Sequence, residues 1–96
     1  MFLGRLFETI RALVINGRYL VGEHATVRLD ERGVLEWQVV DGIDRGELIV
    51  ERPEALPNPA VEIRQLLADG TEIKAVWSHV ISLDAAKLVT VHFFDE

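Results

Sequence analysis

The hydrophobic pattern of this chain changes once, near residue 47, and that change limits the folds it can adopt. Before this point, apolar residues recur every three or four positions, as they do on one face of an amphipathic helix. After it, runs rich in β-branched and aromatic residues alternate with turn-forming residues, which is typical of strands. The sequence therefore predicts an α+β fold in which helices precede an antiparallel sheet.

About three N-terminal helices are expected in residues 1–47. The first ends at Asn16-Gly17, a pair that favours a helix stop. The second begins at Gly22-Glu23, where the glutamate suits the helix dipole, and Gly33 is its predicted C-cap. The third runs from Leu35 to Arg45-Gly46. The apolar face of the first helix consists of Leu3, Leu6, Phe7, Ile10, Leu13 and Val14.

Three or four antiparallel strands are expected in residues 48–96, with the helices covering one face of the sheet. The predicted strands are residues 48–51, 61–67, 72–81 and 88–94. Asp69-Gly70 predicts a tight hairpin turn between the second and third. The prolines between residues 53 and 59 predict a surface loop. Residues 18–21 are interpreted as a link, and residues 83–87 as a turn.

The composition is that of one soluble domain spanning residues 1–96. Apolar residues make up 49% of the chain, enough for a core, and charged residues 27%, which argues against disorder. The chain has no cysteine, which excludes a disulfide scaffold, a thiolate metal site and a cysteine nucleophile, and suits a cytoplasmic location. Arg5, Glu8 and Arg11 interrupt the first apolar segment, so neither a signal peptide nor a membrane span is predicted.

The net charge of −6 weighs against nucleic-acid binding, because contacts with phosphates usually require excess positive charge. The charge is unevenly distributed, however. Residues 1–29 contain four arginines and two glutamates, a net of +2, and residues 30–96 carry the remaining −8. A local basic patch on an acidic body is compatible with this distribution. Equally, the charge can serve only to keep the protein soluble.

The segment His24 to Val34 contains the main candidate site. On a helix, residues four apart stack on one face, so His24, Arg28 and Arg32 are expected to form one stripe. Guanidinium groups suit phosphate oxygens, and a neutral imidazole can accept a proton. The alternative is an ordinary solvated helix face, in which Glu23, Asp30, Glu31 or Glu36 pair with these side chains.

Other aromatic and histidine residues allow further interpretations. His79 and His92 lie on predicted strands, and with Asp95 or Glu96 they are a weak candidate metal site whose spacing matches no known ligand signature. No cofactor or metal is therefore expected, and His92 is retained as a secondary acid. Trp77 is expected in the core, and Trp37 either in the core or on a partner surface.

Several motifs resemble the bacterial family called domain of unknown function 4258. They are Gly17-Arg18-Tyr19, His24-Ala25, Arg28, Arg32-Gly33-Val34, the helix end near Gly46-Glu47, and the terminal strand Leu88 to Phe94. The resemblance covers about residues 9 to 95. The family in turn looks like a relative of the RelE, HigB and MqsR toxins, which are small α+β ribonucleases neutralised by an antitoxin.

The resemblance implies a metal-independent mRNA interferase of a toxin–antitoxin pair. It implies an antitoxin and mRNA or the ribosome as partners, with His24 as base and Arg28 and Arg32 as phosphate ligands. His92, where a tyrosine is expected from the family, stays a candidate site residue as the secondary acid. Two other functions remain open at this stage. One is a non-catalytic module that binds a protein through the arginine stripe or the final strand. The other is a structural or regulatory protein whose histidines and arginines are only surface groups.

Overall fold

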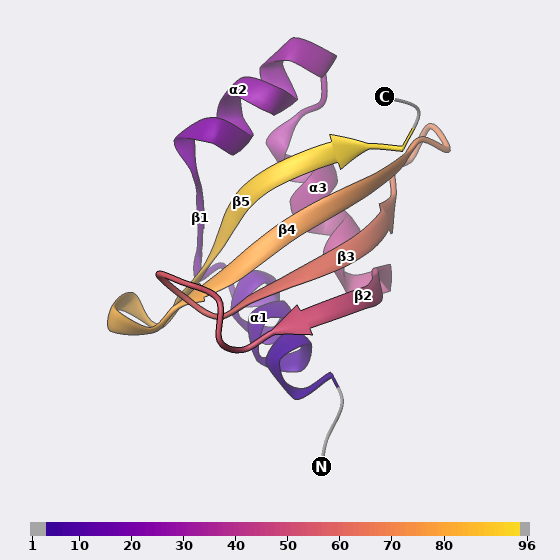
Figure 1. Ribbon diagram of the computed structural model, residues 1–96. Helices are drawn as coiled ribbons and strands as arrows, with labels where there is room; N and C mark the ends of the chain where they lie inside the picture. Colours follow the sequence, from indigo (N-terminus) through magenta and orange to yellow (C-terminus); the bar gives the residue numbers. More distant parts are fainter. Residues whose placement is uncertain (1–3, 95–96) are drawn as a thin grey trace.

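Five strands form one twisted sheet in the order β1-β5-β4-β3-β2 (Figure 1). The computed structural model describes residues 4–94. The strands are β1 (Tyr19–Val21), β2 (Glu47–Arg52), β3 (Ala60–Leu66), β4 (Glu72–Val80) and β5 (Ala85–Phe93). The helices are α1 (Arg5–Ile15), α2 (Glu23–Arg32) and α3 (Glu36–Gly42), with short 3₁₀ turns at Ile43–Arg45 and Ile81–Leu83.

The expected α+β class is confirmed, but the expectation of three or four strands, all antiparallel, was wrong. Residues 18–21, interpreted as a link, contribute β1, which pairs parallel to β5. The amide of Ala86 donates to the carbonyl of Arg18, and the amide of Gly22 donates to that of Leu88. A three-residue strand is too short to show an alternating pattern, and its partner lies more than 60 residues away, so the pairing leaves no local signal.

The element boundaries follow the local sequence closely, with two corrections. α2 begins after Gly22 and ends at Gly33, whose φ of 66° is the left-handed conformation that glycine favours. The third helix is shorter than expected, because its last turn tightens into the 3₁₀ turn Ile43–Arg45. β5 begins at Ala85, inside the expected turn, because the chain already reverses through Ile81–Leu83 and Asp84. Leu3, expected on the face of α1, lies outside the described residues.

The core lies between one face of the sheet and the helices α1 and α3, which cover that face (Figure 1). The helix α2 lies along the edge of β5. Trp77 is completely buried, as expected, and its indole Nε1 donates to Gln65 Oε1 at 3.1 Å. The Gln65 amide Nε2 in turn donates to the carbonyl of Val39 at 2.8 Å, which ties α3 to the sheet. Among the described residues, no helix is long and apolar enough to cross a membrane.

Candidate functional site

The start of α2 is fixed to the sheet through Gly22. Its amide donates to the Leu88 carbonyl at 2.8 Å, and its own carbonyl accepts from the backbone amide and hydroxyl of Thr26. A Cβ at Gly22 would lie 3.0 Å from the Leu88 oxygen and 3.0 Å from Lys87 Cε. The absence of a side chain therefore lets α2 begin directly against β5, with Ala25 and Leu29 buried and Arg28 at the strand edge.

Three side chains able to carry positive charge lie in one row across the uncovered face of the sheet. Arg64 on β3 is directly opposite Lys74 on β4, and Lys74 is directly opposite His92 on β5. Directly opposed side chains in a sheet lie about 5 Å apart at Cβ, and like charges at that distance are destabilising. The Arg64–Lys74 pair is therefore unfavourable by itself, although Glu47 on β2 lies directly opposite Arg64. We call Arg64, Lys74 and His92, together with Arg28, the cation row.

Arg28 extends this row at the edge of β5, beyond the residues of β5 that pair with β1. Its guanidinium Nε donates to the carbonyl of Val91 at 3.2 Å, in the position that a neighbouring strand would occupy. Its Nη1 also lies 3.7 Å from the carboxylate of Glu31, one turn along the helix. These contacts hold the guanidinium beside the strand that bears His92.

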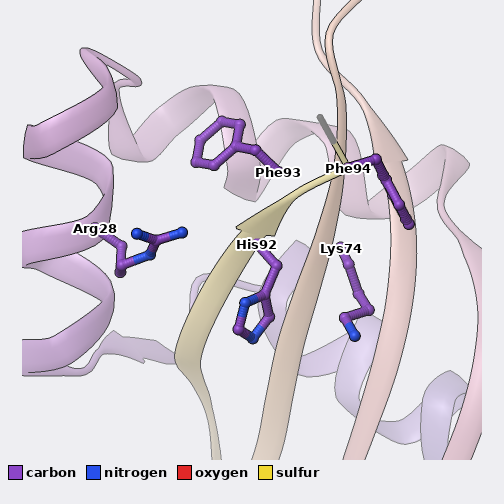
Figure 2. Close-up of a pocket in the computed structure, with 5 residues that line it drawn as sticks. All are labelled: Arg28, Lys74, His92, Phe93 and Phe94. Carbon is purple, nitrogen blue, oxygen red and sulfur yellow. The ribbon is translucent and has the colours of Figure 1, made fainter. Parts of the chain in front are cut away.

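The cation row borders an open hollow of about 400 Å³. Figure 2 shows the five lining residues, with Arg28 reaching in from α2, and His92 and Lys74 projecting from neighbouring strands. Phe93 and Phe94 leave the end of β5 in opposite directions, Phe93 on the side of α2 and Phe94 on the side of Lys74. The hollow therefore combines a titratable imidazole, two cationic side chains and an aromatic surface.

Besides Glu47, which lies opposite Arg64 by register, Glu62 partly offsets the charge of the row. Glu62 on β3 accepts two hydrogen bonds from Arg52, at 3.0 and 2.9 Å, and lies 3.5 Å from Lys74 Nζ. Burial acts to raise the pKa of Glu62, but the hydrogen bond from Arg52 and the charges of Lys74 and Arg52 together hold that pKa below its ordinary value. Glu62 is thus ionised at neutral pH and keeps Lys74 beside the hollow.

The residues of the predicted His24, Arg28 and Arg32 stripe all lie on α2, but their side chains have different surroundings. His24 is exposed one helical turn before Arg28 and does not line the hollow. The Arg32 guanidinium lies 4.7 Å from the centre of the Phe93 ring and borders a second hollow of about 250 Å³ with Gln38 and Asp69. Of the four residues proposed from sequence, Arg28 and His92 line the same hollow, and the roles of all four remain predictions.

A family model described as domain of unknown function (DUF4258) matches residues 21–93. The chain belongs to this family. No curated protein and no solved structure matches the chain. The part that matches DUF4258 runs from the end of β1 to the last residue of β5, so it includes every residue of the hollow except Phe94. The resemblance seen in the sequence is confirmed at the family level, whereas a relationship to RelE-like toxins remains a prediction.

The weak alternative of a metal site gains no support in this DUF4258 chain. His79 Nε2 lies 3.2 Å from Asp84 Oδ1, at the opposite end of β4 from Lys74 and its partner His92. Within residues 4–94, no three His, Asp or Glu side chains are grouped so that they could hold a metal ion. Asp95 and Glu96, the other proposed ligands, lie outside the described residues.

Sequence reasoning missed Lys74 and Phe94 as members of the site. Lys74 lies on the second strand of the hairpin, 46 positions after Arg28, and only the strand register brings the two side chains to one hollow. Alternation offered a partial signal, because Lys74 and Val76 point away from the buried Ile73, Ala75 and Trp77. That pattern places Lys74 on the uncovered face but does not identify its neighbours.

Proposed function

We propose that this DUF4258 protein is a metal-independent endoribonuclease of the toxin type, acting in the cytoplasm. The observation that supports the proposal is the convergence of His92, Lys74 and Arg28 on one open hollow of about 400 Å³. Guanidinium and ammonium groups bind phosphate, and an imidazole exchanges protons near neutral pH. These are the groups required to cleave RNA when its own 2′-hydroxyl is the nucleophile.

The proposed reaction proceeds by acid–base chemistry at one phosphodiester. His92 removes the proton from the 2′-hydroxyl, and the 2′-oxygen attacks phosphorus. Arg28 and Lys74 hold the non-bridging oxygens and stabilise the charge that develops on them. The bond from phosphorus to the 5′-oxygen then breaks, and the leaving oxygen takes a proton from the Lys74 ammonium. The products are a 2′,3′-cyclic phosphate and a 5′-hydroxyl.

The arrangement also fits an acidic protein. By strand register, the uncovered face of the sheet bears Arg52, Arg64, Lys74 and Lys87 against Glu47, Glu62 and Glu72, and Arg28 reaches it from α2. This face is therefore slightly positive although the whole chain carries −6. Short-range contacts with phosphate depend on this local charge, because salt screens charges more than about 8 Å away under physiological conditions.

The deciding experiment measures cleavage of a defined mRNA by the purified protein, with and without ribosomes and with EDTA present. We expect cleavage that resists EDTA and that leaves 2′,3′-cyclic phosphate ends. His92→Ala should lower the rate by about 100- to 10,000-fold, the usual contribution of a positioned general base. Failure of the wild-type protein to cleave RNA under either condition would overturn the proposal.

His24→Ala is the matched control, because it removes the imidazole predicted from the sequence stripe. We expect this variant to retain most of the activity, since His24 does not line the hollow. If His24→Ala loses activity and His92→Ala retains it, the catalytic base belongs to α2 and the assignment of His92 is wrong. Growth arrest on expression in a bacterial host should follow the same order of variants.

Protein binding is a second candidate function, favoured by exposed apolar residues at the start of α3. Leu35 and Trp37 are 58% and 59% exposed, and Leu35 borders a hollow of about 180 Å³ with Val21 and Val34. We propose an antitoxin as the partner. Co-expression with the product of an adjacent gene should yield a complex that Leu35→Ser and Trp37→Ser weaken together. A complex that forms unchanged in that double variant would exclude this surface.

A further inference from the structure

We infer that Phe94 is a stacking platform for a nucleobase and that the hollow accepts single-stranded RNA. The inference rests on the proposed function and defines its substrate class. Phe94 is 49% exposed and lines the same hollow as His92 and Lys74. The Arg64 side chain, the outermost member of the cation row on the sheet, lies with Cζ 5.1 Å from the centre of the Phe94 ring.

Phe94 does not serve core packing, in contrast to the adjacent Phe93. Phe93 is 6% exposed and belongs to the hydrophobic core, whereas Phe94 projects to the uncovered face of the sheet, toward Lys74 (Figure 2). A large aromatic side chain left half in water forgoes much of the stabilisation that its burial would contribute. A nucleobase stacked on the ring would recover that stabilisation, since every base presents an aromatic face.

The spacing along β5 connects the platform to the reaction centre. Phe94 directly follows the last residue of β5, and it lines the same hollow as His92. A base on Phe94 and the phosphate beside His92 therefore belong to the same or to neighbouring nucleotides. Bases in a duplex are paired and stacked on one another, so an aromatic platform of this kind selects unpaired strands.

Arg64 orients the platform and extends it. Its guanidinium lies against the Phe94 ring and keeps its positive charge in the cation row, directly opposite Lys74. Cation–π contact of this kind contributes about 0.5–1 kcal/mol at an exposed site. The pair therefore presents an ordered aromatic surface next to a series of cations, the combination used to bind single-stranded nucleic acid without strict sequence preference.

The test uses an oligonucleotide that binds but does not react. A fluorescein-labelled 2′-O-methyl RNA has no 2′-hydroxyl nucleophile, so anisotropy reports binding without cleavage. Phe94→Leu should weaken binding about 10-fold or more, whereas Phe94→Trp should bind at least as tightly as wild type. The same oligonucleotide annealed into a duplex should bind more weakly than the single strand. Leu66→Ser is the control, because Leu66 is an apolar residue 60% exposed on the same face.

Salt dependence separates stacking from charge. Phe94→Leu removes no charge, so its binding should fall with salt as steeply as that of wild type, whereas Lys74→Met should reduce the slope of log K against log salt by about 0.7. Unchanged affinity in Phe94→Leu, or equal affinity for duplex and single strand, would overturn the inference. Phe94-dependent binding without any cleavage would instead overturn only the proposed nuclease activity.

Discussion

The two faces of the sheet differ in how their polar side chains are paired. On the covered face, Gln65 is buried, and both ends of its amide are hydrogen-bonded, to Trp77 and to Val39. On the uncovered face, Lys74 lies between Arg64 and His92, with Glu47 opposite Arg64 and Glu62 3.5 Å from Lys74 Nζ. The first arrangement stabilises the fold, because a satisfied buried group avoids the cost of desolvation. The second places the like charges of Arg64 and Lys74 side by side, which is unfavourable for that pair.

This difference indicates which residues serve folding and which serve binding. Substitutions on the covered face should lower the free energy of unfolding and leave the activity of the folded molecules unchanged. Substitutions in the cation row should lower the activity and leave the free energy of unfolding almost unchanged. Natural proteins often concentrate locally unfavourable arrangements at functional sites, so the direction of each effect tests the assignment.

The largest change in stability is expected for Gln65→Leu. The substitution leaves the Trp77 indole N–H buried without its partner, which costs about 1–3 kcal/mol, and removes the amide that donates to the Val39 carbonyl. We expect the free energy of unfolding, measured in urea, to fall by about 3 kcal/mol, while binding of the 2′-O-methyl oligonucleotide by folded protein is retained. A variant as stable as wild type would show that this hydrogen-bond chain does not stabilise the fold.

Lys74→Ala should produce the opposite result. We expect RNA cleavage to fall about 100-fold, because one phosphate ligand and the proposed proton donor are lost. The free energy of unfolding should change by less than about 0.5 kcal/mol, since loss of the contact with Glu62 is offset by relief of repulsion from Arg64. Lys87→Ala is the matched control, because Lys87 lies on the uncovered face by register but does not line the hollow.

Substitution of the two arginines of α2, Arg28 and Arg32, tests which of them contacts the phosphate. Arg28→Ala should lower cleavage about 10-fold or more, and Arg32→Ala should have a smaller effect, because Arg32 lies over the Phe93 ring and borders the second hollow. Equal losses in the two variants would show instead that the helix stripe predicted from sequence acts as one phosphate site.

The smallest effect is expected from Glu62→Gln and depends on pH. The pKa of Glu62 in the folded protein is below its ordinary value of 4.5, so its contribution to stability is complete above that pH and is lost as the pH falls through the folded pKa. Between about pH 6 and pH 3, wild type should lose up to about 1 kcal/mol more stability than Glu62→Gln. Parallel curves for the two proteins in urea titrations would contradict this assignment.

Local chemistry made much of the fold predictable. Gly22 and Gly33 bound α2, Asp69-Gly70 lies between β3 and β4, and Trp77 is in the core, all as the sequence indicated. The early start of β5 was missed because Ala85 and Ala86 have low strand propensity, and pairing with β1 and β4 overrides it. Strand propensity depends only on the residues of one segment, whereas strand pairing also depends on the neighbouring strands.

The candidate site was less predictable for the same reason. Helical spacing identified His24, Arg28 and Arg32 as one stripe, but the contacts of α2 with β5 place Arg28 at the strand edge and Arg32 over Phe93. His92 was recognised only as a secondary residue. Its partner Lys74 depends on the register between β4 and β5, including a bulge between Val76 and Trp77, which no local pattern reveals.

The position of β5 has a consequence for how the protein is made. This strand is the last of those described, yet it lies inside the sheet between β1 and β4. During synthesis, β1 therefore has no strand to pair with until residues 86–88, more than 60 positions later, have been added. A nascent chain that lacks residues 85–93 has no hollow, because His92, Phe93 and the Val91 carbonyl that accepts from Arg28 are absent.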